Sequence, residues 1–261
     1  MLKYGRGDFM YALITGASSG IGSDIARELC KKGYDLILVA RRVDRLEKLK
    51  DELGCECRVI GCDLSNPENC IDLFEKVKEE KIEVLINCAG FGVFGNFVET
   101  DLGKEVEMIN TNITALHILT KLFLKKFSEQ NNGYIMNVAS SAAFAPGPMF
   151  SSYYATKAYV LRLSEAIGEE IKKFGKNVHI SVLCPGPVDT EFNSVADVRF
   201  TVGSVTSRFV AEYSVKQMFK HKSIIVPGLK MKLARLGAKI LPEWISAKVT
   251  YNFQRKKDGQ C

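Results

Sequence analysis

The sequence predicts an α/β protein: a doubly wound parallel sheet of seven strands, with helices covering both faces in a three-layer arrangement. Short apolar runs alternate along the chain with longer amphipathic segments. The short runs are continuously apolar rather than alternating, as is typical of parallel strands buried on both faces. The length of 261 residues suits one domain of this kind. Ligands of such sheets bind beyond the carboxyl ends of the strands, so we expect the site there.

The strands and helices follow from local patterns. Ile21, Ile25 and Leu29 are spaced four apart, which predicts a helix that Gly33 ends, and Pro67 follows a capping residue at the start of another helix. We expect strands at residues 11–15, 35–40, 58–62, 84–87, 134–140, 178–184 and 223–226. Helices are predicted at 19–32, 43–53, from 65–67 onward, and at 100–127, 151–174 and 206–220.

The composition excludes several classes of protein. With 46% hydrophobic residues, 25% charged residues and seven prolines, the chain is neither disordered nor collagen-like. No apolar run approaches the roughly 20 residues of a membrane span, and the N-terminus lacks a secretory signal. Eight cysteines are then expected as reduced thiols, in a cytoplasmic protein. Cys55, Cys57, Cys62 and Cys70 do not match a zinc spacing, so no metal is predicted.

The net charge of +6 is unevenly distributed. Residues 216–258 contain eleven Lys or Arg and two acids, so this stretch carries +9 and the rest of the chain −3. A basic C-terminal region alone would suggest a nucleic-acid partner, but no zinc-finger, helix-turn-helix or RNA-binding motif accompanies it. We therefore predict no nucleic-acid binding.

A glycine-rich turn joins the first strand to the first helix. Gly16, Gly20 and Gly22 form a GxxxGxG pattern, which allows a tight turn, close backbone approach to a pyrophosphate, and an anion at a helix N-terminus. Its position between a strand and a helix supports a dinucleotide site that also includes Ser18, Ser19 and Ile21.

The end of the second strand indicates which dinucleotide binds. An acid there would hold the ribose 2′-hydroxyl of NAD, but the sequence has Arg41 and Arg42, which can bind a 2′-phosphate. We predict NADP(H); the alternative is a solvated arginine pair. Asp63, beside Leu64, either contacts the adenine or caps the next loop. Small residues after the fourth strand are expected to line the cofactor ribose: Asn87, Ala89 and Gly90.

A candidate catalytic pair lies after the fifth strand. Tyr153 and Lys157 are four residues apart on one predicted helix and so share a face. An ammonium beside a phenol is expected to lower the pKa of Tyr153 toward working pH. Ser140, at the strand end, is the candidate partner; Ser141 makes the choice slightly ambiguous, and strand length from Gly133 favours Ser140.

Together these motifs resemble the short-chain dehydrogenase/reductase family over residues 10–228. They are TGASSGIG (15–22), NCAG (87–90), the Asn112 region, Ser140, YYATK (153–157) and PGPVDT (185–190). Cys88, where alanine is more usual, and the second serine at 141 are the departures. The family's fold is a single Rossmann-like domain.

The resemblance implies a role for each matching residue. Tyr153 would be the general acid or base, Lys157 would adjust its pKa and bind the nicotinamide ribose, and Ser140 would orient the substrate oxygen. Asn112 would hold a water that relays protons, with Asn110 the less favoured match. Four residues of the PGPVDT segment would surround the nicotinamide: Pro185, Gly186, Val188 and Thr190.

The expected function is NADP(H)-dependent interconversion of a hydrophobic ketone and its secondary alcohol. Apolar side chains in 145–150 and 191–205 predict an apolar substrate pocket. A hydroxysteroid, a bile acid or a 3-oxoacyl compound would each fit. A non-catalytic NADPH-sensing regulator and a sugar-nucleotide epimerase are the alternatives. We also expect a homodimer or homotetramer.

The chain is expected to divide into a Rossmann-like domain at 10–228, a basic C-terminal tail at 229–261, and a peripheral extension at 1–9. In the tail, Leu229, Leu233, Leu236 and Ile240 form a helical stripe that Pro242 ends. The first hypothesis is that these leucines pack on the domain or on a second subunit, with the basic residues in water. The second is that the helix borders the substrate entrance and makes peripheral contact with an anionic surface, either a membrane or a carrier protein.

Overall fold

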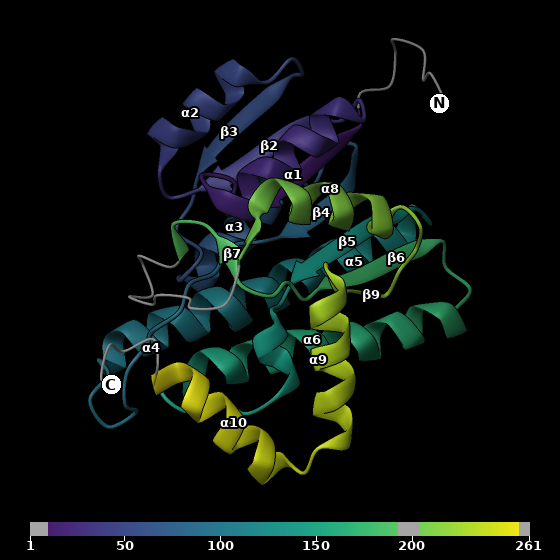
Figure 1. Cartoon of the computed structure of the whole chain (residues 1–261). Coiled ribbons are helices and arrows are strands. Elements are labelled where there is room, and N and C mark those ends of the chain that lie inside the picture. The colour runs from purple at the N-terminus through teal and green to yellow at the C-terminus, as the bar shows by residue number, and fades with distance from the viewer. Residues whose placement is uncertain (1–9, 193–203, 256–261) are drawn as a thin grey trace.

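The computed structural model of the chain describes residues 10–192 and 204–255. Its centre is the predicted parallel seven-stranded sheet, and the strands lie in the order β3-β2-β1-β4-β5-β6-β9 (Figure 1). The strands are β1 (Tyr11–Thr15), β2 (Asp35–Ala40), β3 (Cys57–Gly61), β4 (Ile82–Asn87), β5 (Gly133–Val138), β6 (Val178–Leu183) and β9 (Ile224–Ile225). The predicted extension at 1–9 lies outside the described residues.

Two hydrophobic clusters, one on each face of the sheet, make the three layers. On one face pack α1 (Gly20–Lys31), α2 (Val43–Glu52) and α8 (Ser207–Met218). On the other face pack α3 (Pro67–Val77), α5 (Leu116–Glu129) and α6 (Ser151–Lys173). Side chains of β2 alternate between the two clusters, with Leu36 and Leu38 in one and Ile37 and Val39 in the other. Burial on both faces explains why the strands are continuously apolar.

The predicted helix at 100–127 is interrupted. The chain forms α4 (Leu102–Ile109), a π-helical turn η1 (Asn110–Ala115), and then α5. A π-helical turn widens the helix by one residue per turn and commonly occurs at functional sites. Here it lies at Asn112, where the sequence predicted a site residue.

Several other boundaries differ from the predictions. β5 ends at Val138, so Ser140 lies beyond it, at the start of the 3₁₀-helix η2 (Ser141–Phe144). A small second sheet pairs β7 (Val188–Asp189) with β8 (Val205–Thr206), and α10 (Glu243–Arg255) follows the tail helix; neither was predicted. Pairs as short as these strands carry too weak a periodic signal to be seen in a sequence.

The tail helix forms as predicted, at α9 (Leu229–Ile240). The face that it turns toward the domain differs from the first hypothesis. Leu229, Leu233, Leu236 and Ile240 are all exposed, so the hypothesis that they pack on this domain is wrong. Met231 and Arg235, on a different face of the helix, contact the domain, and the Lys232 ammonium lies over the ring of Tyr213 in α8.

Candidate active site

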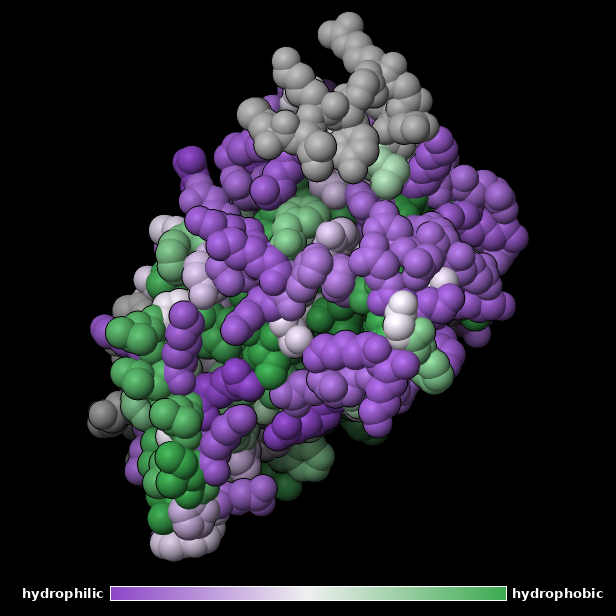
Figure 2. All heavy atoms as spheres, turned by 90° about the vertical axis from the view of Figure 1, so that its right-hand side faces the viewer, coloured by the Kyte–Doolittle hydropathy of each residue, from purple (hydrophilic) through white to green (hydrophobic). Residues whose placement is uncertain are grey.

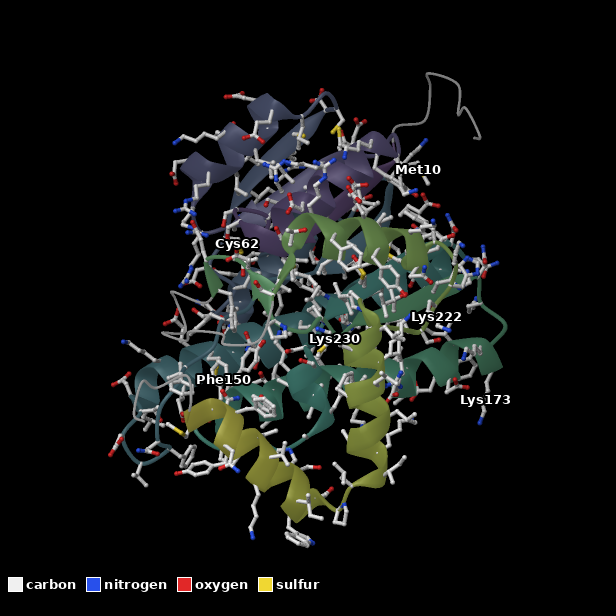
Figure 3. All side chains as sticks on the ribbon, in the orientation of Figure 1. Met10, Cys62, Phe150, Lys173, Lys222 and Lys230 are labelled. Carbon is white, nitrogen blue, oxygen red and sulfur yellow. The ribbon has the colours of Figure 1, made fainter. Side chains whose placement is uncertain are left out.

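A cavity of about 430 Å³ opens at the carboxyl edge of the sheet. That volume falls within the range of small-molecule sites. Cys62 and Phe150, labelled in Figure 3, both line it, so the cavity extends along the strand ends from β3 to the segment before α6. The strand order reverses between β1 and β4, and the residues that follow both strands line the cavity. This is the position at which doubly wound sheets bind ligands.

The glycine turn forms the floor of one end of the cavity. Gly16 has φ +68° and Gly20 has φ +56°, and a Cβ on Gly22 would lie 2.2 Å from the carbonyl oxygen of Gly16. Other residue types would therefore strain or clash in this turn. The Ser19 hydroxyl makes no capping bond to α1, so the helix N-terminus is not capped by this side chain. These features fit a pyrophosphate.

Thr15, which the sequence did not mark as a site residue, connects the two central strands at this point. The Oγ1 of Thr15 accepts hydrogen bonds from the backbone N–H groups of Cys88, at 3.0 Å, and of Ala89, at 3.2 Å. The same hydroxyl donates to the carbonyl of Ile86. Thr15 thereby fixes the glycine turn relative to the NCAG segment. Its signal was its place in the TGASSGIG motif.

The two arginines lie at the outer end of the cavity. Nη2 of Arg42 donates to the hydroxyls of Ser18 and Ser19, at 3.2 and 2.9 Å. Nη1 of Arg42 lies 2.9 Å from a carboxylate oxygen of Glu191, and Arg41 pairs with Glu107 at 2.7 Å. The arginines are therefore not merely solvated.

Glu191 was not foreseen in this role. Its carboxylate also pairs with Arg45, and hydrogen bonds from Arg45 and Arg42 lower its pKa. A carboxylate thus lies on two guanidinium groups at the place proposed for a phosphate. No pattern in the sequence links residue 191 to residues 42 and 45.

Asp63 caps the loop after β3, as one of the two hypotheses held. Its carboxylate accepts hydrogen bonds from the backbone N–H of Ser65, at 3.0 Å, and from the Ser65 hydroxyl, at 2.9 Å. These bonds lower the pKa of Asp63, the backbone bond most. Asp63 and Leu64 also line the cavity.

Asn87 does not line the cavity, contrary to our expectation. It is buried, and its Nδ2 donates to Thr120 and to Asn137 on the neighbouring strand β5. The residue ends β4 with its side chain in the sheet layer, and Ala89 and Gly90 form the cavity wall instead.

Asn112 also lies behind the wall rather than in it. Its Oδ1 accepts from the N–H of Phe91 at 3.1 Å, and its Nδ2 donates to the carbonyl of Phe91 and to the hydroxyl of Thr156. A Cβ on Gly90 would lie 2.8 Å from Asn112 Oδ1 and 3.4 Å from Lys157 Nζ. The π-helical turn thus brings Asn112 close to the glycine of NCAG and to the lysine.

Tyr153, Ser140 and Lys157 come together at the inner end of the cavity. Tyr153 and Ser140 both line this end of the cavity, and Ser140 acts to lower the pKa of Tyr153 through its side chain. Nζ of Lys157 donates to the carbonyl of Val138 at 3.0 Å and lies 5.7 Å from the centre of the Tyr153 ring. Both serines line the cavity, and of the two only Ser140 contributes to the pKa shift of Tyr153, which favours Ser140 as the partner of the tyrosine.

The pKa of Tyr153 is raised, whereas the sequence led us to expect a lowered pKa. Burial raises the pKa of Tyr153 strongly, and the bond from Ser140 lowers it only in part. Burial likewise lowers the pKa of Lys157 to about 8. The lysine ammonium is directed to a backbone carbonyl, so it does not offset the burial of the phenol.

The PGPVDT segment forms a further side of the cavity. Pro185, Gly186, Val188 and Thr190 all line it, as predicted, and the side chain of Thr190 lies against Gly20 of the glycine turn. The segment therefore connects the two ends of the site.

The wall beside Tyr153 is aromatic. The ring of Phe150 stacks on that of Tyr153 with centres 4.5 Å apart, and Phe192 lies 5.3 Å from Tyr153. Of the segment 145–150, Phe150 alone lines the cavity. Most of the other predicted wall, residues 193–203, lies outside the described residues, whereas Tyr154 and Phe91 line the cavity without having been predicted.

The fold, the glycine turn and the Tyr-x-x-x-Lys pair at the strand ends together define a nucleotide-dependent oxidoreductase site. Residues 10–198 match the family described as short chain dehydrogenase. The protein belongs to the short-chain dehydrogenase/reductase family.

Individual relatives agree with this assignment. Human 17-beta-hydroxysteroid dehydrogenase type 3 is 31% identical over 214 residues, which cover 77% of this chain and 66% of that protein. This chain thus spans just under two thirds of that relative's length.

Solved structures are also similar. A short-chain dehydrogenase from Sphingobium yanoikuyae in complex with NADPH has a TM-score of 0.78 and 29% identity, covering 90% of this chain and 97% of that one. The bulky-bulky ketone specific alcohol dehydrogenase from Comamonas testosteroni has a TM-score of 0.75 and 26% identity, covering 89% and 95%.

Neither a membrane-spanning helix nor a metal cluster occurs among the described residues. No helix in residues 10–192 or 204–255 is long and apolar enough to cross a bilayer. Within the same ranges no cluster of His, Cys, Asp or Glu has an arrangement suited to a metal ion.

Proposed function

We propose that this protein interconverts a hydrophobic ketone and its secondary alcohol, using NADP(H). The observation that carries the proposal is the convergence of three side chains on the inner end of the cavity: Tyr153, Ser140 and the buried Lys157, one helical turn from Tyr153. A bound nicotinamide would supply or accept the hydride. The protein's own groups would then hold the substrate oxygen and move one proton.

In this mechanism Tyr153 donates its proton to the carbonyl oxygen during reduction and accepts it from the alcohol during oxidation. Burial raises the pKa of Tyr153, so the phenol is protonated at neutral pH, which is the form that reduction requires. Ser140 Oγ would hydrogen-bond the same substrate oxygen. Lys157 would return a proton toward Tyr153, and a water held near Asn112 and Gly90 would connect the lysine to solvent.

The choice of NADP(H) is supported by charge at the outer end of the cavity. Arg41 and Arg42 line it and occupy the two positions directly after β2, and Arg42 already binds the two serines of the glycine turn. A 2′-phosphate there could accept charge-assisted hydrogen bonds from both guanidinium groups. The similar structure from Sphingobium yanoikuyae holds NADPH.

The aromatic wall supports an apolar substrate. Phe91, Phe150, Tyr154 and Phe192 line the cavity beside Tyr153, and such rings favour a fused-ring or long-chain ketone over a sugar. The human relative is named as a 17-beta-hydroxysteroid dehydrogenase, and the Comamonas testosteroni enzyme is named as an alcohol dehydrogenase specific for bulky-bulky ketones. A hydroxysteroid, a bile acid or a 3-oxoacyl compound would suit the same wall.

We also propose that the protein forms a homo-oligomer. α4 exposes Leu102, Val106 and Ile109 on one face, an apolar surface of the kind that subunit contacts bury. Light scattering of the purified chain would test this: a monomeric mass at micromolar concentration would contradict it.

A panel of ketones tests the function. NADPH oxidation should be fast with bulky cyclic ketones or 3-oxoacyl thioesters and slow with sugars and small hydroxy acids. NADH should support the same reaction less well. Binding of NADPH without turnover of any ketone or alcohol would instead favour the cofactor-sensing regulator.

A further inference from the structure

Helix α9 contacts the domain through one face and leaves its most apolar face uncovered. The inner face contains Met231 and Arg235, one helical turn apart. The Met231 sulfur would lie 2.6 Å from a Cβ on Gly186, so the methionine fills the space that the glycine leaves. The Arg235 guanidinium lies over the ring of Phe144, 5.8 Å from its centre. The helix is therefore held in place without its leucines.

The outer face is a continuous apolar stripe, which we call the α9 stripe: Leu229, Leu233, Leu236 and Ile240. Their exposed fractions are 72, 60, 57 and 75%. Leu241 and Trp244, at the turn into α10, are exposed as well. Figure 2 shows hydrophobic atoms gathered at the lower left of the molecule, where α9 and this turn lie. Exposed apolar surface of this extent usually marks an interaction site.

Lysines border the α9 stripe on both sides. With about 100° per residue, Lys230 lies about 90° to one side of the stripe centre and Lys239 about 90° to the other. Lys232, on the same side as Lys239, has its ammonium over the ring of Tyr213 in α8, 5.7 Å from the ring centre. Residues 229–255 contain six Lys or Arg and one acid, Glu243, a net charge of +5. Lys248 lies over the ring of exposed Trp244, with 5.2 Å between the ammonium and the ring centre.

We propose that the α9 stripe, with Leu241 and Trp244, is a docking surface for an anionic lipid bilayer. An apolar stripe between rows of lysines, with a tryptophan at one end, suits a helix lying in the plane of a membrane surface. The leucines would enter the acyl region while the lysine stems extend to anionic headgroups. A second copy of this chain would bring like charges together, which disfavours that occupant.

Helices α9 and α10 both contact residues that line the cavity. α9 packs on Gly186, and Gln254 of α10 donates a 2.8 Å hydrogen bond to the hydroxyl of Tyr154; Gly186 and Tyr154 both line the cavity. A docked molecule would thus hold its apolar cavity wall near a lipid phase, which suits the hydrophobic substrate proposed above. The docking itself does not depend on that substrate.

Vesicle sedimentation of the full chain tests the proposal. The probes are phosphatidylcholine vesicles with and without phosphatidylserine, each at low and high salt. We expect binding to the serine-containing vesicles at low salt, weaker binding at high salt, and little binding without the anionic lipid. The double variant Leu233→Gln/Leu236→Gln should lower the partition coefficient by at least about tenfold.

Two further variants make the test specific. Ile71→Gln replaces an exposed apolar residue on α3, beside Glu68, Asp72 and Glu75, and should bind like the wild type. Lys230→Gln/Lys239→Gln should weaken binding while leaving the apolar stripe intact, which keeps the test valid if the leucine variant is unstable. No binding to anionic vesicles, or equal binding by all variants, would overturn the proposal. It would also be overturned if, without lipid, the leucine variant changed from dimer to monomer in sedimentation velocity, because the stripe would then join two copies.

Discussion

The two ends of the cavity are built on different physical principles. At the inner end, Tyr153 and Lys157 are buried and hydrogen-bonded, and their pKa values move away from the ordinary ones because water is excluded. At the outer end, Arg41, Arg42 and Glu191 are exposed ion pairs that salt and solvent screen. We expect that replacing a buried group at the inner end removes most of the turnover. We expect that replacing an exposed charge at the outer end changes the preference between NADPH and NADH by a moderate factor. Substitutions at the two ends should therefore differ in kind.

The largest expected effect is at the inner end. Tyr153→Phe keeps the ring stacked on Phe150 and removes the proposed proton donor, so kcat should fall by about 10²–10⁴. Binding of NADPH, measured by fluorescence titration, and the melting temperature should change little. Tyr159→Phe, on the exposed side of the same helix, is the matched control and should retain turnover. A fully active Tyr153→Phe enzyme would end the mechanism and direct attention to Tyr154.

The burial of Lys157 should be visible in stability. Burial lowers the pKa of Lys157 from 10.5 to about 8, so between these values the folded protein binds fewer protons than the unfolded chain. The contribution of this residue to stability is therefore lowest below pH 8 and rises as the pH approaches 10.5. Relative to Lys157→Met, the wild type should gain about 2–3 kcal/mol of unfolding free energy between pH 7 and 10.

Urea denaturation without added cofactor, at both pH values and for both proteins, measures that gain. Taking the difference between the two proteins cancels the other groups that titrate in this range. A difference independent of pH would show that Lys157 is solvated, and the contrast between the two ends would disappear.

At the outer end, Arg41→Ala/Arg42→Ala should raise KM for NADPH at least about tenfold and change KM for NADH much less. kcat at saturation should be nearly unaffected, because the chemistry lies at the other end. Arg58→Ala is the control: this arginine is paired with Glu80 at 3.0 Å and does not line the cavity. A wild-type preference for NADH would contradict the assignment of NADP(H).

The smallest expected effect concerns Glu191. Because this carboxylate pairs with Arg42, it would have to yield to a 2′-phosphate. Glu191→Gln should therefore lower KM for NADPH by about two- to fivefold, the scale of an exposed ion pair, and the gain should shrink at high salt. Steady-state kinetics at two ionic strengths would measure it. A rise in KM would show that Glu191 helps to position the arginines.

The amino-acid sequence by itself determined the parts of this protein that depend on local patterns. Continuous apolar runs specified the sheet, since parallel strands are buried on both faces. The spacing of Gly16, Gly20 and Gly22 specified a turn that only glycine fits, and a four-residue separation placed Tyr153 and Lys157 on one helix face. Such patterns identified the glycine turn and the Tyr153–Lys157 pair in the cavity lining, whereas the 185–190 segment was identified through the resemblance to the family.

Tertiary structure alone decided what depends on distant contacts. Glu191 reaches Arg42 across 149 positions of sequence. Asn112 turns to Phe91 because a π-helical turn interrupts the helix. The pKa of Tyr153 is raised because packing buries it, whatever its neighbour in sequence. For α9 the pattern predicted that a helix forms, but not which of its faces packs on the domain. Met231 fits against Gly186, so the leucines face outward. Periodicity shows which residues share a face, and only the packing partner decides which face is buried.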